Sequence, residues 1–156
     1  MAGKGSGPGK IAAQNRKARH EYEVLDSFEA GIVLQGTEVK AVREGKITLK
    51  DSYAVIQGGE VFLHKAHISH YEPASRFNHE LERPRKLLMH RWEIRRLAGQ
   101  AEQKGLTLVP LKVYFKRGRV KVELALVRGK KLYDKRRDIA RRDAERAIDR
   151  ALREKP

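Results

Sequence analysis

The chain has 156 residues and contains no cysteine. The absence of cysteine excludes disulfides, thiolate zinc ligands and a cysteine nucleophile. No apolar run approaches the roughly 20 residues that a membrane-spanning helix needs. The first ten residues are glycine-rich and lack the apolar centre of a signal peptide. We therefore expect a cytoplasmic protein that does not interact with a membrane.

Acidic residues are scarce relative to basic ones. Lys and Arg number 35 against 20 Asp and Glu, which gives a formal net charge of +15. Such an excess attracts phosphate backbones, and the resulting complexes weaken steeply with salt because binding releases counterions. Nucleic acid is the favoured partner on this charge, and we set aside the second choice, an anionic membrane surface.

Short apolar segments separated by glycine turns dominate the middle of the chain. Residues 120–127 alternate between apolar and polar side chains, as in a strand with one buried face. Hairpins are predicted around Gly58-Gly59 and Arg117-Gly118, and a longer strand covers 22–34, interrupted by Gly31. The fold class expected is mainly β with helices: a small antiparallel OB-like β-barrel of five to six strands, two or so helices and a basic C-terminal tail.

Two helices are predicted beside the strands. Thr37 is a suitable N-cap for a short helix that Gly45 ends. A longer helix is predicted from Pro84 to about Lys104, with Leu87 and Leu88 facing the core. The domain organisation expected is a flexible basic N-terminal tail over 1–13, the RNA-binding barrel over 14–128 and a basic tail over 129–156.

The segment from Arg128 to Pro156 carries twelve Lys and Arg against six Asp and Glu, a net charge of about +6. Its apolar residues have helical spacing but are mostly alanine, which buries little area. We expect a tail that is disordered when free and helical on a polyanion. The alternative is a solvated C-terminal helix without a partner. Tyr133 lies between two basic pairs, a pattern that suits base stacking beside phosphate contacts, although packing on the barrel explains it equally well.

Signals for enzyme chemistry are weak. His64, His67 and His70 resemble a metal cluster, but on a strand His67 points away from the other two. His20 and Glu29 suggest an acid/base pair for which the sequence gives no geometry. No phosphate-cradling loop motif is present. We expect no catalytic residue, no metal and no cofactor.

Several ordered motifs resemble the SmpB family, the SsrA-binding proteins of bacterial trans-translation. They run from about residue 14 to residue 137. They are Asn15-Arg16-Lys17-Ala18-Arg19-His20-Glu21-Tyr22, Phe28-Glu29-Ala30-Gly31, Gly36-Thr37-Glu38-Val39-Lys40, Arg43-Glu44-Gly45-Lys46, Asp51-Ser52-Tyr53, Ala66-His67-Ile68, Arg85-Lys86-Leu87-Leu88, Lys104-Gly105-Leu106-Thr107-Leu108-Val109-Pro110-Leu111, Gly129-Lys130-Lys131 and Asp134-Lys135-Arg136. Lys65 stands where the family often has Asn.

This resemblance implies an RNA-binding adaptor that is not an enzyme. Its barrel would clamp the tRNA-like domain of transfer-messenger RNA (tmRNA, or SsrA). With elongation factor Tu on the alanyl-tmRNA, it would enter the A site of stalled ribosomes as a monomer. The tail would lie in the empty mRNA channel near the decoding centre, in place of a codon–anticodon pair.

The resemblance also assigns residues to two surfaces. The tmRNA-binding residues implied are His20, Glu29, Gly36, Thr37, Glu38, Lys40, Arg43, Lys46, Arg85, Lys86, Leu88 and His90. The ribosome-binding residues implied are Gly129, Lys130, Lys131, Tyr133, Asp134, Lys135, Arg136, Ile148 and Leu152. Two other functions remain open: a ribosomal or assembly protein that binds rRNA constitutively, and an RNA-processing enzyme that uses the histidines or Glu29.

Overall fold

The computed structural model describes residues 9–102, 105–129 and 146–147. Within these residues the chain forms nine strands, three α-helices and one 3₁₀ helix, η2. In chain order the elements are β1 (Ile11–Gln14), α1 (Arg16–Glu21), β2 (Tyr22–Ile32), α2 (Gly36–Arg43), β3 (Ile47–Thr48), β4 (Tyr53–Gln57), β5 (Glu60–His64), β6 (His67–Ile68), η2 (Glu72–Phe77), β7 (Arg85–Leu88), α3 (Arg91–Ala101), β8 (Leu106–Lys116) and β9 (Arg119–Gly129).

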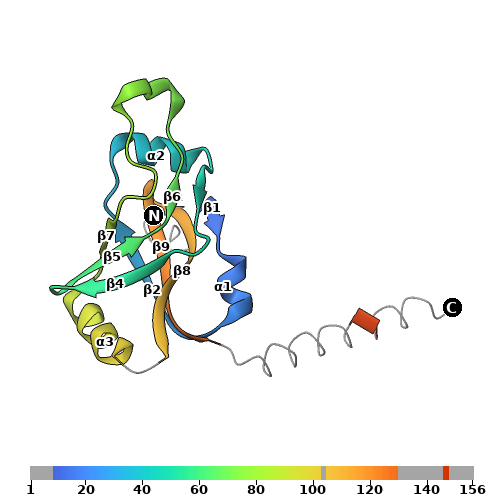
Figure 1. The fold of residues 1–156 in the computed structure, drawn as a ribbon, viewed down its shortest axis with the longest axis vertical. Helices are drawn as coiled ribbons and strands as arrows, with labels where there is room; N and C mark the ends of the chain where they lie inside the picture. The colour runs from blue at the N-terminus through green and yellow to red at the C-terminus, as the bar shows by residue number, and fades with distance from the viewer. Residues whose placement is uncertain (1–8, 103–104, 130–145, 148–156) are drawn as a thin grey trace.

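The large sheet closes on itself. Its strand order is β1-β8-β4-β5-β7-β2-β9, and the additional pairing of β8 with β9 completes an antiparallel ring of β8, β4, β5, β7, β2 and β9. β1 pairs with residues 112–114 of β8, and β3 pairs with β6 in a separate two-stranded sheet. The predicted OB-like barrel is confirmed (Figure 1).

Glycine turns place the two predicted hairpins where the sequence indicated. Gly58 and Gly59 both have positive φ between β4 and β5, and the turn from β8 to β9 has φ of 52° at Arg117 and 76° at Gly118. Lys65 also has a positive φ, 63°, at the bend between β5 and β6. This left-handed conformation strains most side chains but suits Asn and Gly. Asn would therefore adopt this conformation at lower cost than Lys65 does.

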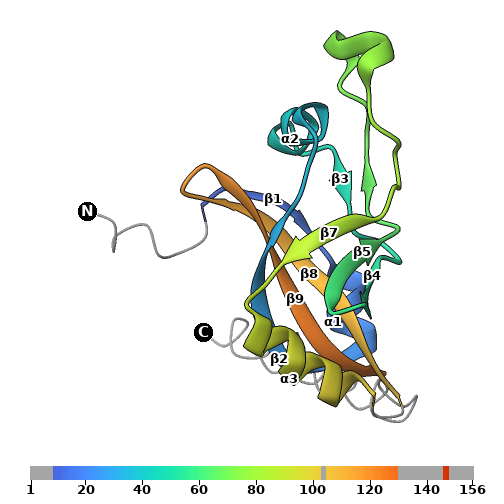
Figure 2. The ribbon, with the colours of Figure 1, turned by 90° about the vertical axis from the view of Figure 1, so that its left-hand side faces the viewer.

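The barrel core consists of the inward-facing residues of the strands and is covered at its two ends by helices. Ala41 and Val42 of α2 and Leu97 of α3 are fully buried in this core. The two helices lie at opposite ends of the barrel in both views of Figures 1 and 2. The loop between β6 and β7, which carries η2, projects beyond α2.

The ring is weakest between β4 and β8, where a single residue pair, Ala54 with Leu108, joins the strands. A groove of about 370 Å³ lies beside this pair. Residues of β4, α3 and β8 line it, among them Val55, Ala98 and Leu106. The barrel is therefore partly open at this seam.

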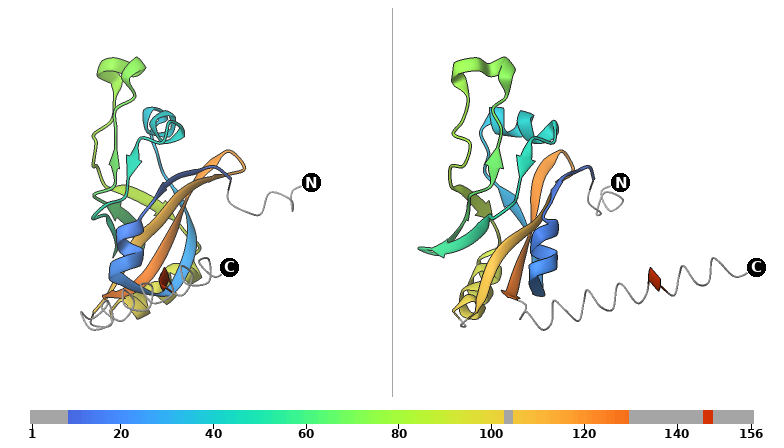
Figure 3. Two further views of the ribbon diagram at one scale, coloured as in Figure 1. Left: turned by 90° about the vertical axis from the view of Figure 1, so that its right-hand side faces the viewer. Right: turned by 45° about the vertical axis from the view of Figure 1, so that its right-hand side comes forward.

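The N-terminal segment is more ordered than the sequence suggested. The flexible tail predicted for 1–13 contains strand β1 in its last residues, and the backbone N–H of Gly9 already bonds to the carbonyl of Phe115 at 2.6 Å. The Asn15 side chain accepts from the N–H of Ala18 at 3.1 Å and caps α1. Helix α1 packs Ala18 against Val109 and Val127 on the outside of the β8–β9 hairpin (Figure 3).

Three local predictions were wrong. The longer helix does not begin at Pro84: residues 85–88 form strand β7, and α3 begins only at Arg91. Leu87 is buried as expected, but Leu88 faces outward. Thr37 does not cap α2, because the N-cap residue is Gln35. The backbone N–H of Gln35 donates to Oε1 of Glu38 at 2.8 Å, which fixes the first turn of the helix.

Candidate nucleic-acid interface

One wall of the barrel presents polar and charged side chains outward. Phe28 and Ala30 of β2 are buried in the core, so the alternation of the strand turns Glu29 to the outside. The same alternation turns Lys121 outward from β9. We call this region the outer-wall surface, which comprises Arg19, Glu29, Leu88, Lys116, Lys121 and Glu123.

Glu29 is the centre of the outer-wall surface. Its Oε2 accepts a hydrogen bond from the Tyr114 hydroxyl, and its Oε1 lies 3.1 Å from Nζ of Lys116. Partial burial raises the pKa of Glu29, but the bonds from Tyr114 and Lys116 outweigh burial and hold it below its ordinary value. Burial and the bond to Glu29 raise the pKa of the Tyr114 hydroxyl. Glu29 is thus an oriented carboxylate, and its remaining lone pairs suit amino or hydroxyl donors.

Leu88 lies directly over Gly31 on the same surface. The two residues are paired across β7 and β2, and a Cβ on Gly31 would stand 3.3 Å from Cβ of Leu88. The Lys121 Nζ would be 3.8 Å from that added Cβ. The absence of a side chain at position 31 therefore lets an exposed leucine and a lysine ammonium lie side by side.

Helix α1 brings His20 to the edge of this surface. His20 is exposed in the last turn, beside Arg19, whose Nη2 lies 3.4 Å from Oε1 of Glu123. Glu123 is paired with Glu29 across β9 and β2. The structure thus brings Glu29 and Leu88, which are far apart in the sequence, to one wall of the barrel, and it places His20 next to Arg19, which pairs with Glu123 of that wall.

His90 adjoins this wall at the start of α3. Its backbone N–H donates to Oε1 of Glu93 at 3.0 Å, which fixes the first turn of the helix. Its ring stacks on the indole of Trp92, with centroids 6.4 Å apart and an angle of 11° between the planes. Sequence reasoning did not select Trp92. Its signal was the presence of a single tryptophan beside Arg91 in a basic segment.

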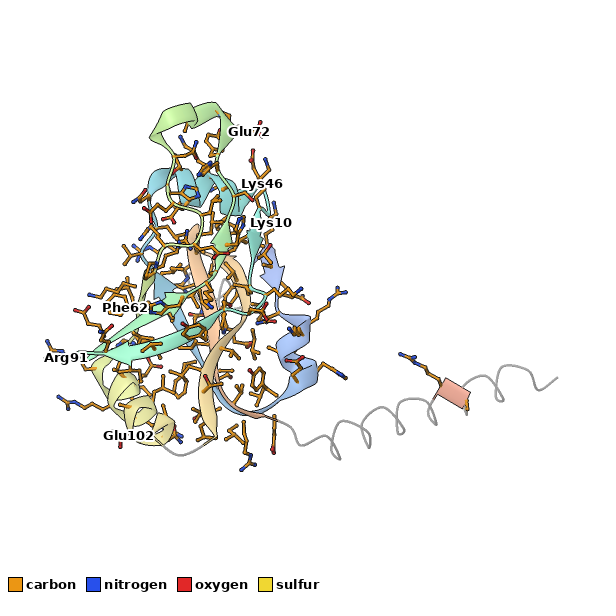
Figure 4. The ribbon with its side chains drawn as sticks, viewed as in Figure 1. Lys10, Lys46, Phe62, Glu72, Arg91 and Glu102 are labelled. Carbon is orange, nitrogen blue, oxygen red and sulfur yellow. The ribbon has the colours of Figure 1, made fainter. Side chains whose placement is uncertain are left out.

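The predicted residues Gly36, Thr37, Lys40, Arg43 and Lys46 form a second group on α2 and the turn after it. The Thr37 hydroxyl lies 2.9 Å from Nδ1 of His79, and the Lys40 ammonium lies 5.4 Å from the centre of the Tyr71 ring. The carbonyl of Arg43 accepts from Nζ of Lys10 at 2.9 Å. Figure 4 shows Lys46 and Lys10 at the α2 end of the barrel, away from Arg91 at the start of α3.

Glu38 and Arg85 were predicted to contact tmRNA, and the structure contradicts this because both side chains are buried. The side chains of Glu38 and Arg85 have no exposed surface, so they do not reach a ligand on the outside. Arg83 and Arg85 both pair with Glu38, and Arg85 also donates to the carbonyl of Ala66 at 2.6 Å. Motif matching assigned a binding role to residues whose charges neutralise each other inside the fold.

The other residues predicted to bind RNA lie on β7, at the end of β9 and beyond it. Lys86 is half-exposed, 3.4 Å from Glu60. Gly129 is the last residue of β9 and still pairs with Tyr22. The remaining predicted ribosome-binding residues, Lys130, Lys131, Tyr133, Asp134, Lys135, Arg136, Ile148 and Leu152, lie outside the described residues.

The histidine trio is dispersed over different environments. His64 stacks on Tyr53 at 5.5 Å, whereas His70 contacts the ring of His79 edge-on at 5.6 Å. In the described ranges, no three His, Asp or Glu side chains gather as a metal would require. Over the same ranges, no helix has the length and apolar character to span a membrane.

The fold and its charged outer wall define a chain of the OB-like barrel class. Comparison with known proteins gives the particular family: the family model of the SmpB protein matches residues 12–154. This chain belongs to the SmpB family.

Its relatives are similar over almost their whole length. An SsrA-binding protein from Desulforudis audaxviator is 64% identical and covers 95% of this chain and 97% of its own. One from Moorella thermoacetica is 62% identical, with 94% and 95% covered. A solved structure described as "tmRNA-SmpB: a journey to the center of the bacterial ribosome" superposes with a TM-score of 0.68 at 52% identity. The match covers 80% of this chain and 87% of that one.

Proposed function

We propose that this protein binds the tRNA-like domain of tmRNA and accompanies it to the A site of stalled ribosomes. The observation that carries the proposal is the outer-wall surface, where an ionised Glu29 with fixed orientation, an exposed Leu88 and Lys121 lie together on an SmpB-family barrel. The names of the relatives and of the solved structure support RNA of this class as the ligand.

The surface has chemistry suited to folded RNA. Lysine and arginine side chains contact phosphates without regard to sequence, whereas a carboxylate accepts only from donors such as base amino groups or 2′-hydroxyls. A negative charge at the centre of a basic surface costs affinity for bulk RNA. We therefore interpret Glu29 as the group that selects a particular RNA geometry.

The tail completes the proposed role. It begins after Gly129, the last residue of β9, and residues 130–156 carry eleven Lys and Arg against six Asp and Glu. In the proposal the tail enters the empty mRNA channel and engages the decoding centre, while elongation factor Tu holds the alanyl-tmRNA. The protein acts in the cytoplasm as a monomeric binding protein, without turnover of its RNA.

The test pairs two measurements on two forms of the protein. One form is the full chain, and the other ends at Gly129, the last paired residue of β9. Affinity for tmRNA is measured by labelled-RNA anisotropy, and function is measured by peptide tagging on ribosomes stalled without a codon. We expect truncation to leave tmRNA affinity within about threefold and to abolish tagging, since the barrel supplies the affinity and the tail supplies the signal.

Three other results would count against the proposal. Tagging that survives truncation would reduce the tail to a solvated appendage. Equal affinity for tmRNA and bulk RNA at moderate salt, with stoichiometric co-sedimentation on translating ribosomes, would favour the constitutive rRNA binder. Cleavage of RNA by the pure protein, abolished by substitution of His20 or Glu29, would favour an RNA-processing enzyme.

A further inference from the structure

The only tryptophan of the chain is strongly exposed. The Trp92 side chain is 60% exposed, the largest exposed fraction among the large hydrophobic residues of the described chain, and Leu88 follows at 51%. Neither packs into the core. A single exposed aromatic does not by itself indicate an interaction site, so the role of Trp92 depends on the groups that surround it.

Trp92 is held on a rigid support. Its indole stacks on His90, and the carbonyl of His90 accepts from the N–H of Ile94 at 3.0 Å. Met89 and Ile94, on either side of the stack in sequence, pack against the barrel core. The backbone that carries the two rings is therefore fixed to the barrel before a ligand binds, which lowers the conformational entropy that the protein loses on binding.

Cationic groups lie next to this aromatic pair. Arg91 and Arg95 are exposed on the first turns of α3, and Figure 4 shows Arg91 at the edge of the molecule. Arg96, one residue further, is fixed by an ion pair with Asp26 at 3.3 Å. An aromatic platform flanked by guanidinium groups fits a planar base attached to a phosphate.

The platform is continuous with the outer-wall surface. Leu88 ends β7, His90 follows after one residue, and Leu88 lies over Gly31 beside Lys121. We propose that Trp92, supported by His90, stacks on an unpaired base of the RNA bound at this surface. This inference rests on the proposed function, since it requires that RNA lies on the outer wall.

The experiment uses the single tryptophan as its own reporter. The full chain is titrated with an in vitro transcript of the tRNA-like domain of tmRNA. Binding is followed by anisotropy of a label on the RNA, and Trp92 is followed by its intrinsic fluorescence and its quenching by acrylamide. Since no other tryptophan is present, every change in indole emission reports on position 92. We expect the emission to fall in step with binding and the indole to become less accessible to acrylamide.

Substitutions test the energetic contribution. Stacking on one base is worth enough for Trp92→Ala to weaken binding by between about fivefold and a hundredfold, whereas Trp92→Phe retains most of the affinity. Val55→Ala is the matched control: Val55 is 37% exposed but lies in β4, two strands away from β7 in the sheet. We expect this control to bind as the unmodified protein does. Thermal melts should coincide for all forms because each replaced side chain lies at the surface.

The salt dependence separates stacking from charge. Trp92→Ala should leave the slope of log affinity against log salt unchanged, whereas Arg91→Ala should reduce it by about one. Normal binding by anisotropy with unchanged indole emission would overturn the stacking while leaving the proposed function intact. Retained RNA affinity in Trp92→Ala would also overturn it and would point to a protein side chain as the occupant. Absence of any preference for the transcript over bulk RNA would instead defeat the proposed function.

Discussion

Arg85 and Glu38 form a buried ion pair, with Nε of Arg85 2.6 Å from Oε2 of Glu38 and no exposed surface on either side chain. The pair joins the first turn of α2 to strand β7. Arg85 also donates to the carbonyls of Glu80 and Leu81, so the same guanidinium fixes the base of the loop that carries η2. The orientation of α2, with its basic residues, therefore depends on this contact.

Removal of the Glu38 carboxylate should destabilise the fold strongly. Glu38→Ala leaves the Arg85 guanidinium buried without its counter-ion, and we expect a loss of about 3–5 kcal/mol in the free energy of unfolding. Urea denaturation followed by circular dichroism measures it. Glu60→Ala, which removes the half-exposed partner of Lys86, serves as control and should cost less than about 1 kcal/mol. Equal effects of the two substitutions would contradict a structural role for Glu38.

Acid should weaken the same contact. Burial raises the pKa of Glu38, but the hydrogen bonds from Arg83, the Gln35 N–H and Arg85 lower this pKa by more than burial raises it. The stabilisation is thus complete above the unfolded-state pKa of about 4.3 and is lost as pH falls below it. We expect Glu38→Gln to flatten the fall of unfolding free energy below about pH 4.3, measured by urea titrations at each pH. An unchanged pH profile would exclude this carboxylate as a source of acid sensitivity.

Glu29→Gln should separate specific from non-specific RNA binding. Loss of an ionised acceptor should weaken binding of the tRNA-like domain by about tenfold or more. Removal of a negative charge should at the same time slightly strengthen binding to bulk RNA. The control is Glu23→Gln, which removes a carboxylate that pairs with Arg128 at 2.9 Å. Competition binding at fixed salt distinguishes the outcomes, and stronger binding of both RNAs by Glu29→Gln would show that the carboxylate does not contact the ligand.

Gly31→Ala should disturb the surface more than the fold. The added methyl group would be 3.3 Å from Cβ of Leu88, and Leu88 is exposed and can move. We expect a change of less than about 1 kcal/mol in unfolding free energy but a clear loss of RNA affinity. Because both substitutions act through one side chain, Leu88→Ala should add little further loss in the Gly31→Ala background. A double-mutant cycle measures the coupling, and strictly additive losses would refute it.

Lys65→Asn should stabilise the protein. Lys65 holds φ at 63°, a conformation that Asn adopts at lower cost. We expect a gain of about 0.5–1 kcal/mol in unfolding free energy, measured by urea denaturation. The control is Lys50→Asn, which makes the same replacement at an exposed residue whose φ is not positive, and it should give no gain in unfolding free energy. A loss at Lys65→Asn would show that the lysine side chain makes a compensating contact.

The sequence was most informative where structure is local. Gly58-Gly59 and the Arg117-Gly118 turn specify their hairpins within a few residues, and the alternation in β9 gives the buried face. Strand β7 was mistaken for helix because Arg85 to Leu88 are good helix formers that follow a proline. Its strand conformation comes from pairing with β5 and β2, which the local sequence does not encode.

The N-terminal elements were missed for the same reason. Asn15 caps α1 and also donates from Nδ2 to the carbonyl of Pro110 at 3.0 Å, a contact across most of the chain. Among the candidate site residues, the resemblance supplied Glu29 and Leu88, which the fold brings to one wall, and His20, which lies beside Arg19 in α1. It could not show that Glu38 and Arg85 are buried, because a charged residue has the same sequence signature whether it faces RNA or another charge.

The seam between β4 and β8 has a consequence for folding order. The β4–β5 and β8–β9 hairpins each join neighbouring segments, whereas the Ala54–Leu108 pair closes a long loop of chain with one strand contact. Loop-closure entropy makes such a contact late to form and early to break. Since a single strand pair offsets this entropy at the seam, we expect the ring to open there first, and amide exchange in the native protein should be fastest there among the barrel strands.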